Sequence, residues 1–472
     1  MQKPPIAIVG LGVFAALCGL LPLSYLFLRL FEGLEKALAE LLRPRTIELL
    51  ANTLLLTVSV TVTAVIIGSF QAWLTTRTIL FAAAFFAVLG TLPLAIPSYV
   101  LALAYSSVLP WFSGFFAAWL TLSVVTAPYV FLAVSAALAR SNVAQEEVAR
   151  SLGLSRFQVL TKVTWPQVRT AAMASGLLVA LYTLSEFGAV SILRFDTFTR
   201  AIYNAYRGSF DRTAAAALAV VLVVLTLLVL YFEKRYRSDY TRVEKQAKQP
   251  RINLGAWRYL IGLGLVLLAA VSVFVPVTAL VLWSSNASSW DLGQIFEALT
   301  VSLSIASLAG AVIGVFAIAV ALWNVRFSSR FASGVELTIW SSHALPGLVV
   351  ALALVFFGAN LTPGIYQTVW LLIFAYLILF LPNALSVITT PIAQVSTSQE
   401  QVARSLGLGK LGAIFFAAAL AATIFWTGLE FHDDKMIPAN QLGLIWSYGA
   451  IGLAAIVVIW PKLSKSVWSK RI

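Results

Sequence analysis

The sequence predicts an all-α polytopic membrane protein of about 12 transmembrane helices in two parallel six-helix repeats. Three observations support this. Hydrophobic residues make up 60% of the 472 residues and charged residues 11%, whereas soluble globular proteins carry about 25% charged residues. The apolar residues gather in runs long enough to cross a bilayer as helices, which takes about 20 residues, and they lack the alternation of membrane strands. A polar decapeptide also occurs twice, once in each half.

The first repeat is expected over residues 1–232 and the second over residues 259–472. The expected helices lie near 6–30, 52–74, 79–108, 114–139, 171–193, 213–232, 259–283, 299–322, 335–358, 365–389, 411–429 and 442–460. Because neighbouring helices can satisfy the carbonyl groups that proline frees, prolines inside these runs predict kinks rather than breaks. They are Pro22, Pro93, Pro97, Pro128, Pro346 and Pro382. The run 6–30 is too long for a signal-peptide core and is expected to be a retained helix.

Basic residues predict the orientation of the chain. If the N-terminus is cytoplasmic, 23 of the 32 Lys and Arg residues fall on the cytoplasmic side. Basic residues mark that side, so we expect a multi-pass protein of the bacterial cytoplasmic (inner) membrane with both termini in the cytoplasm. The net charge of +13 then reflects topology rather than nucleic-acid binding. Residues 233–258 form a basic cytoplasmic linker, which could also contact membrane lipid.

The two halves are related by an internal repeat. Residues 145–154 (QEEVARSLGL) and 399–408 (QEQVARSLGL) are identical at nine of ten positions, at an offset of 254. Upstream, residues 95–105 match residues 344–354 at six of eleven positions, at an offset of 249. Each half is expected to hold six helices, which return the chain to its starting side, so the repeats run in parallel.

The polar decapeptide of the first half is expected to form a short helix outside the membrane, in a loop near 140–170. Glu146 and Glu147 stand near its start, where the helix dipole favours acidic side chains. Gly153 follows it, as a C-terminal capping glycine would. A second basic helix is expected over 155–168.

This loop resembles the EAA motif of ATP-binding cassette (ABC) importer permeases, which reads E-A-A, three residues, G, nine residues, I-x-L-P. Here Glu147-Val148-Ala149, Gly153 and Val163-Thr164-Trp165-Pro166 keep that spacing. Val148, Val163 and Trp165 depart from the usual residue types. Two six-helix halves in one chain look like the iron(III) transport permeases and their thiamine and phosphonate relatives, and residues 185–212 are similar to the iron(III) group.

The resemblance implies a coupling helix that docks on a separate ATPase subunit. The implied partners are two cytoplasmic ABC ATPase subunits and a periplasmic or extracellular substrate-binding protein. ATP would be used by the partner subunit, and no cofactor would be bound by this chain. The implied coupling residues are Glu146, Glu147, Ala149, Gly153 and Pro166, with Glu400, Ala403 and Gly407 in the second half.

The second half departs from the motif, with a shortened loop near 396–410. Gln401 stands where the motif has Glu, and residues 417–420 read AAAL instead of I-x-L-P. Two hypotheses stay open: the short second loop still couples, or this half is a damaged copy.

Few charged residues lie inside the expected spans. Tyr182, Glu186 and Asp196 are candidates for the translocation pathway, because charge within a span usually faces a cavity. An alternative for Glu186 is a surface pair with an arginine such as Arg194. One cysteine and two histidines predict no metal site.

Three other function classes are alternatives to an iron(III) importer permease. Permeases of this type for thiamine, phosphonate or another small solute are the first alternative to iron(III). An ion-coupled secondary transporter would place titratable residues at mid-membrane, and few occur here. A membrane enzyme would need a nucleophile and base or a metal site, and no phosphate-binding GxxxxGK[ST] motif occurs, so the chain is not expected to be an enzyme.

Overall fold

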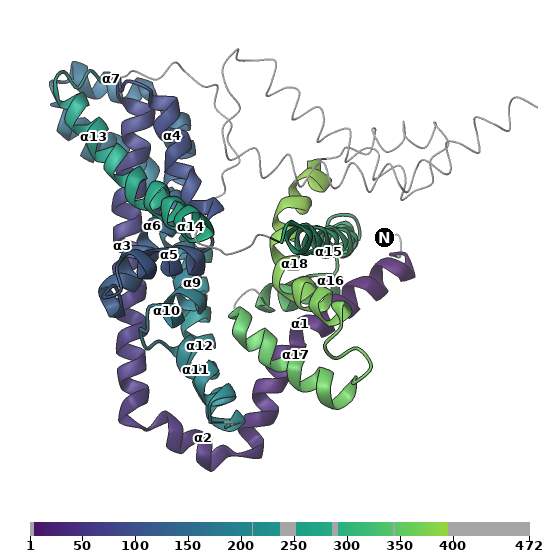
Figure 1. The fold of residues 1–472 in the computed structure, drawn as a ribbon. Coiled ribbons are helices and arrows are strands. Elements are labelled where there is room, and N and C mark those ends of the chain that lie inside the picture. Colours follow the sequence, from purple (N-terminus) through teal and green to yellow (C-terminus); the bar gives the residue numbers. More distant parts are fainter. Residues whose placement is uncertain (1–3, 210, 237–251, 286–290, 343–344, 395–472) are drawn as a thin grey trace, which may run out of the picture. The chain divides into compact units, whose positions relative to one another are not determined.

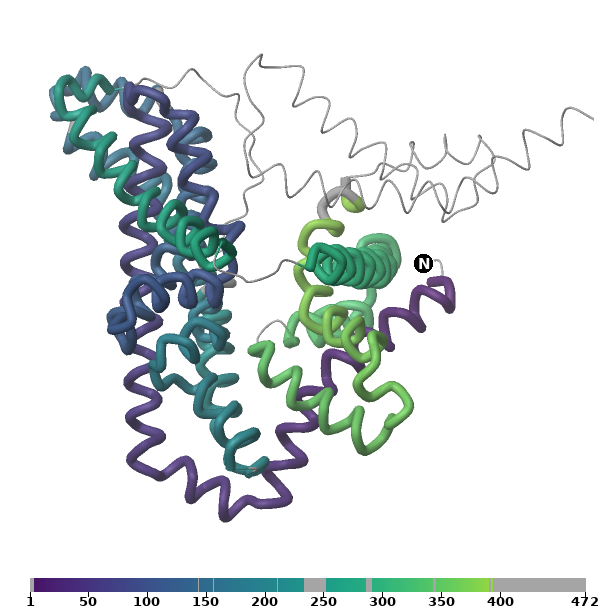
Figure 2. Tube along the Cα trace, viewed as in Figure 1, coloured from purple at the N-terminus to yellow at the C-terminus, as the bar shows by residue number. Residues whose placement is uncertain are grey.

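The computed structural model describes residues 4–209, 211–236, 252–285, 291–342 and 345–394. In these ranges the chain is helical, as predicted, apart from connections and one isolated bridge between Thr78 and Ile252. The helices fall into two compact units, residues 26–290 and residues 1–25 with 291–472 (Figures 1 and 2). The expected helices at 411–429 and 442–460 lie outside the described residues.

The unit of residues 26–290 holds six membrane-spanning elements and several short helices. Its helices are α2 (Leu34–Leu41), α3 (Pro44–Arg77), α4 (Ala83–Thr91), η1 (Leu92–Ala95), α5 (Ser98–Val108), α6 (Gly114–Arg140), α7 (Val143–Ser151), α8 (Arg156–Val159), η2 (Leu160–Thr164), α9 (Trp165–Ser185), α10 (Gly188–Ile192), α11 (Phe198–Arg207), α12 (Arg212–Tyr236), α13 (Trp257–Ala269), η3 (Ala270–Phe274) and α14 (Val275–Ser285). The segments η2 and η3 are π-helical turns, and η1 is a 3-10 turn.

The core of this unit lies between α3, α6 and α9, which pack against one another. Leu56 of α3, Leu122 of α6 and Ala172 of α9 are buried there. Gly68 allows a close approach of α3 to α6, because a Cβ at that position would lie 2.6 Å from the carbonyl oxygen of Ala127. Small residues at helix contacts are typical of membrane bundles, in which packing rather than the hydrophobic effect drives association.

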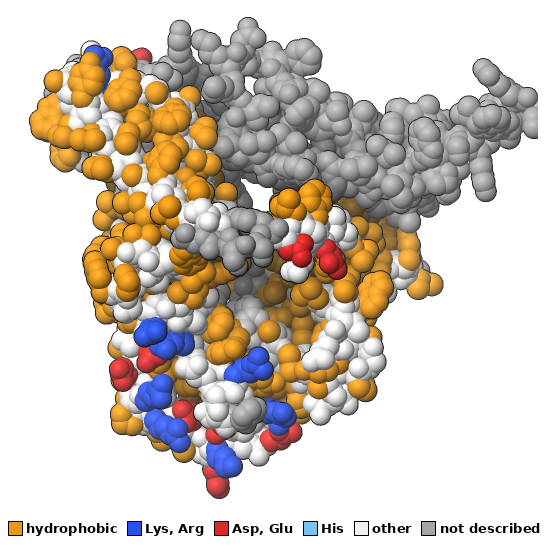
Figure 3. Space-filling view, viewed as in Figure 1, with side chains coloured by type: hydrophobic (Ala, Val, Ile, Leu, Met, Phe, Trp, Pro, Cys, Tyr) orange, Lys and Arg blue, Asp and Glu red, His pale blue; other side chains and the backbone are white. Residues whose placement is uncertain are grey.

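The outward face of α3 is apolar. Half or more of the surface is exposed at four residues of this face: Leu55, Val62, Ile66 and Phe70. Figure 3 shows hydrophobic side chains over the flanks of this unit. A continuous exposed apolar surface is unfavourable in water, so lipid is the solvent that this face requires.

The second unit contains most of α1 (Ile6–Glu32), together with α15 (Leu292–Arg326), α16 (Arg330–Ser342), α17 (Gly347–Leu361) and α18 (Val369–Gln394). Ile8, Ala15 and Ala16 of α1 share a buried cluster with α15, α16 and α18. Gly12 permits this contact, because a Cβ there would lie 2.7 Å from the Trp323 ring.

The compact units differ from the predicted repeats by one helix in each direction. The first helix of the first repeat packs in the unit of the second, and α13 to α14, which open the second repeat, pack in the unit of the first. Tyr105 of α5, for example, donates a hydrogen bond of 2.6 Å to the carbonyl of Val271. A sequence repeat reports which segments are related, whereas compactness reports which helices bury one another. The repeat boundaries 1–232 and 259–472 therefore stay a prediction.

Eight helices in the described ranges are long and apolar enough to cross a membrane, and two bent pairs raise the number to ten if each pair is one span. These ten correspond to the first ten expected helices, so the multi-pass all-α class is confirmed. Several boundaries were wrong by five residues or more. The helix expected at 52–74 begins at Pro44, the helix expected at 171–193 runs from Trp165 to Ser185, and the helix expected at 299–322 begins at Leu292.

The expectation that prolines kink but do not break the helices was wrong at two spans. The helix expected at 79–108 is bent by 95° between Ala95 and Ser98, and the helix expected at 335–358 is likewise a bent pair. Ile96 is extended (φ −102°, ψ 115°), the conformation that a following proline imposes, and Pro97 starts a new helix. Pro22, Pro128 and Pro382, in contrast, lie inside continuous helices.

Candidate functional site

The strongest candidate site is residues 141–164, which join α6 to α9 and which we call the connecting segment. Its first helix, α7, begins after a capping asparagine and ends before a glycine. The side chain of Asn142 accepts a hydrogen bond from the backbone N–H of Gln145 at 3.3 Å, which caps the first turn. At the other end Gly153 adopts a positive φ of 83°, and Leu154 N–H donates to the Ala149 carbonyl at 3.2 Å. Together with the bond from Gly153 N–H to the Arg150 carbonyl at 2.9 Å, this is a Schellman termination.

The two faces of α7 differ in exposure and chemistry. Glu146 and Ala149 are 4% and 5% exposed and face the chain's own helices. Val148 and Leu152 are 57% and 75% exposed, and Phe157 of α8 is 73% exposed. We call Val148, Leu152 and Phe157 the apolar ridge. Val148 and Leu152 project from a polar helix, and Phe157 opens the apolar span Phe157–Ser185. An exposed apolar ridge of this kind is a candidate surface for a partner.

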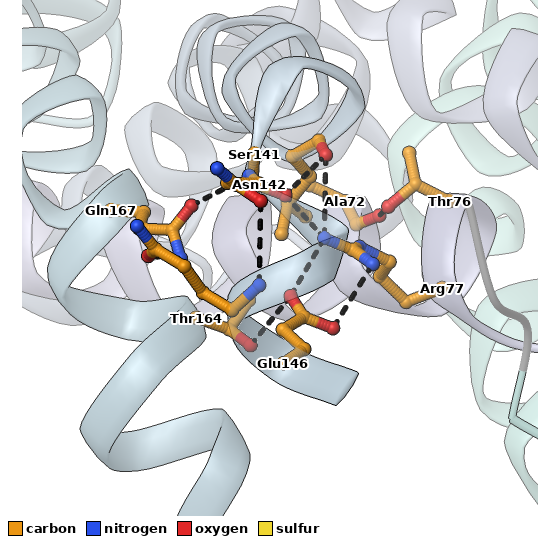
Figure 4. Close-up of polar contacts among 10 residues, drawn as sticks. Ala72, Thr76, Arg77, Ser141, Asn142, Glu146, Thr164 and Gln167 are labelled. Carbon is orange, nitrogen blue, oxygen red and sulfur yellow. Dashed lines mark hydrogen bonds and ion pairs between the residues drawn. The ribbon is translucent and has the colours of Figure 1, made fainter. Parts of the chain in front are cut away.

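A buried ion pair holds the inward face of α7. Arg77, the last residue of α3, donates to Glu146 Oε1 at 3.0 Å and to Oε2 at 3.3 Å, and the two side chains are 3% and 5% exposed. The hydroxyl of Thr164 in η2 donates to the same Oε1 at 3.0 Å. Figure 4 shows these groups converging from α3, α7 and η2. Charge-assisted bonds of this kind are stronger than neutral ones, and removal of one partner would leave an uncompensated buried charge.

Arg77 also reaches the C-terminal end of α6. Its guanidinium donates to the carbonyl of Leu138 at 3.5 Å and to the hydroxyl of Ser141. Ser141 in turn donates to the Leu138 carbonyl at 2.8 Å. One arginine therefore joins the ends of two core helices to α7 (Figure 4).

Glutamine side chains tie the same helix to α9. Gln167 Oε1 accepts from the backbone N–H of Asn142 at 2.8 Å, and its amide donates to Gln145 Oε1 at 3.2 Å. Between Gln145 and Gln167 the chain passes through the π-helical turn η2, which ends at Thr164, two residues before the predicted motif residue Pro166. Pro166 is exposed and has no N–H to donate, which favours a widened turn ahead of it.

A cavity of about 210 Å³ adjoins the ion pair. Trp73, Leu160 and Ile252 give it apolar walls, while Arg77 and Arg150 bring positive charge. The cavity lies beside Phe157 of the apolar ridge.

The predicted coupling residues of the first half are thus divided between two surfaces. Glu147, Gly153 and Pro166 are exposed, whereas Glu146 and Ala149 are buried within the chain. Their coupling role stays a prediction. Glu400, Ala403 and Gly407 lie outside the described residues.

The predicted pathway residues lie at the opposite end of α9. Glu186 is the C-cap residue of α9, and its carboxylate accepts from Ser98 Oγ at 2.8 Å and from the backbone N–H of Ala189 in α10 at 2.9 Å. It is held by these groups and not by Arg194. Tyr182, one turn earlier, lies near the same carboxylate, and Asp196 pairs with Arg200 at 2.6 Å. The structure brings Tyr182 and Glu186 together but holds Asp196 in a separate pair.

Arg77, Ser141 and Gln167 were not predicted as site residues, and Thr164 was named only for its place in the motif. Arg77 was counted only among the basic residues that predict the orientation of the chain. Its position at the end of an apolar run could have indicated a role at the helix end. Within the described ranges no group of three or more His, Cys, Asp or Glu residues is placed to hold a metal ion.

Long apolar helices, with a structured polar segment between two of them, define a multi-pass membrane protein. The chain belongs to the family described as binding-protein-dependent transport system inner membrane component, whose model matches residues 64–238. This span includes the whole connecting segment, and the resemblance to ABC importer permeases is confirmed.

Individual relatives are transport permeases. The chain is 36% identical over 420 residues to the Fe(3+)-transport system permease protein FbpB 2 of Haemophilus influenzae, covering 86% of this chain and 82% of the relative. It is 27% identical over 252 residues to the sulfate transport system permease protein CysT of Escherichia coli, covering 49% of this chain and 91% of the relative. The thiamine transport system permease protein ThiP of Escherichia coli is 25% identical over 285 residues, 56% of this chain and 52% of the relative.

Proposed function

We propose that this chain is the permease subunit of an ABC importer that takes up iron(III) across the bacterial cytoplasmic membrane. The observation that carries the proposal is the 36% identity to an Fe(3+)-transport permease along 86% of the chain. The other relatives, for sulfate and thiamine, match shorter shares of the chain at lower identity. Fe(3+) is the cargo here and needs no resident metal site in the permease.

The connecting segment supports a coupling role. Its apolar ridge is exposed, and its two helix ends are fixed by Asn142 and Gly153, so a partner would meet a preformed surface. The partner is a cytoplasmic ABC ATPase subunit, with two such subunits serving the two halves. Both termini of this chain are then cytoplasmic, in line with the count of basic residues.

The energy source is the partner, because the sequence has no GxxxxGK[ST] motif of its own. This chain is not an enzyme and binds no cofactor. A substrate-binding protein delivers iron(III) on the outer side. ATP binding closes the ATPase subunits, the connecting segment moves with them, and the halves alternate between outward and inward access. This assignment excludes the ion-coupled carrier.

The test is uptake into proteoliposomes that contain this chain, its ATPase and the binding protein. Radiolabelled iron(III) should accumulate when ATP is enclosed with the ATPase and not when a non-hydrolysable analogue replaces it. Radiolabelled sulfate and thiamine, each offered with its own binding protein, are the matched alternatives. Uptake of either one without uptake of iron(III) would overturn the substrate assignment but keep the permease.

A further inference from the structure

We infer that Arg77 is a positioning residue that transmits displacement of α7 to the transmembrane helices α3 and α6. This inference rests on the proposed function, because it concerns how a docked ATPase would move the spans. It is separate from docking itself, since Arg77 is buried and does not belong to the apolar ridge.

The inward face of α7 is fixed to α3 and η2 through one carboxylate. The helix has nine residues, and of the side chains described on it Glu146 and Ala149 are the buried ones. Ala149 offers a single methyl group, and such small apolar contacts are non-directional and allow sliding. Glu146 is fixed by two bonds from Arg77 and one from Thr164. Asn142 and Gln145 join α7 to α9 through Gln167, whereas the Glu146 carboxylate joins α7 to α3 through Arg77. A force on the ridge therefore reaches α3 through this carboxylate.

Arg77 stands where the ends of α3 and α6 meet. The 34 residues of α3 make a helix of about 51 Å at about 1.5 Å per residue, longer than the roughly 30 Å bilayer core. Arg77 is at its end, and the same guanidinium binds the last turn of α6 through Leu138 and Ser141. Because α3 and α6 pack along their lengths, a pull on Arg77 acts on both core helices together.

The second repeat has the same arginine-to-carbonyl contact. Arg326 ends α15 and is related to Arg77 by the offset of 249 that also relates residues 95–105 to 344–354. Arg326 donates to the carbonyl of Ile392 at 3.5 Å, the distance of Arg77 from the carbonyl of Leu138. Ile392 is related to Leu138 by the offset of 254 of the decapeptides. Two copies with different surroundings thus join the ends of their second and fourth spans through an arginine.

The test separates a coupling role from a purely structural one. An apolar pair, Arg77→Met with Glu146→Leu, removes both charges and preserves side-chain volume, an exchange that often leaves stability unchanged or improved. The matched control is Arg43→Met with Glu40→Leu, which removes the ion pair beside the other end of α3, where Arg43 is exposed. Each variant is reconstituted with the ATPase and binding protein, and iron(III) uptake and ATP hydrolysis are measured together.

We expect the apolar pair to reach the membrane, retain the ATPase and hydrolyse ATP, but to import about tenfold less iron(III) per ATP, within the usual range of coupling energies. The Arg43 and Glu40 control should keep the wild-type ratio. A wild-type ratio in the apolar pair would show that the ion pair is structural and would overturn the inference. Should the apolar pair fail to accumulate, Arg77→Lys replaces it: a single ammonium cannot reproduce the fork to Glu146 and Leu138, so a wild-type ratio there overturns the inference equally. If the wild type itself binds no ATPase, the failure belongs to the proposed function.

Discussion

Glu146→Ala is the change whose consequence the structure defines most sharply. It removes the carboxylate that faces Arg77 at 3.0 Å, and Arg77 is 3% exposed, so its charge would stay buried without a counter-ion. Breaking a buried pair in this way costs about 3–5 kcal/mol. The Thr164 hydroxyl loses its acceptor in the same step. We expect the free energy of unfolding to fall by about 3–5 kcal/mol.

The neighbouring residue supplies the matched control for this change. Glu147 is exposed, so Glu147→Ala should alter the free energy of unfolding by less than about 0.5 kcal/mol. The assay is unfolding of the purified chain in mixed micelles, with both variants and the wild type at one detergent composition. Equal stability of Glu146→Ala and Glu147→Ala would refute the buried network.

A double-mutant cycle tests the pairing itself. Arg77→Ala and Glu146→Ala each leave the other charge alone, whereas the combined variant leaves neither. The combined loss should therefore be smaller than the sum of the single losses by about 0.5–3 kcal/mol. Additive losses would show that the two side chains act independently.

Three further predictions concern the segment ends and α9. Gly153→Pro should abolish co-purification of the ATPase, because proline cannot adopt the φ of 83°. Gly153→Asn should retain the ATPase, because asparagine tolerates that conformation. Equal retention of the ATPase by both variants would argue against the termination geometry. Leu152→Glu should weaken ATPase binding at unchanged membrane levels, while Leu152→Ala should weaken it less, as measured by titration of the purified ATPase; a wild-type affinity for Leu152→Glu would remove the ridge from the interface. Glu186→Gln keeps one acceptor oxygen for Ser98 or Ala189 and should preserve membrane levels, whereas Glu186→Ala should lower the free energy of unfolding by about 1–3 kcal/mol; unchanged iron(III) uptake in Glu186→Gln would remove this residue from the pathway.

The sequence was most informative where structure is local. Apolar runs located ten spans, because a bilayer imposes length and composition on each helix separately. Gly153 marked the end of α7 for the same reason, since a positive φ is a requirement at one residue. The breaks at Pro97 and Pro346 were not predicted, because a proline in a membrane helix kinks or breaks it according to the neighbours that satisfy the freed carbonyls.

The site was less predictable because its main contact joins residues 69 positions apart. Glu146 and Glu147 are adjacent and look equivalent in sequence. Packing of α7 against α3 buries Glu146 in an ion pair with Arg77 and leaves Glu147 exposed. The sequence also did not predict that the first helix of each repeat packs in the compact unit of the other repeat. The apolar surfaces of α1 and α13 do not specify which helices they contact.

The central claim, that the apolar ridge meets the ATPase, is tested most directly by cross-linking. The chain has one cysteine, Cys18, which is buried, so Cys18→Ala gives a background free of cysteine. Leu152→Cys on that background and the lipid-facing control Ile66→Cys are each treated, in the purified complex with the ATPase, with a short heterobifunctional reagent. Its maleimide alkylates the cysteine thiol, and its diazirine loses N₂ on illumination to give a carbene that inserts into a nearby C–H or N–H bond of the ATPase. The account predicts a covalent product with the ATPase from Leu152→Cys and none from Ile66→Cys. An intact complex with no product from Leu152→Cys would place the docking surface elsewhere and contradict the account.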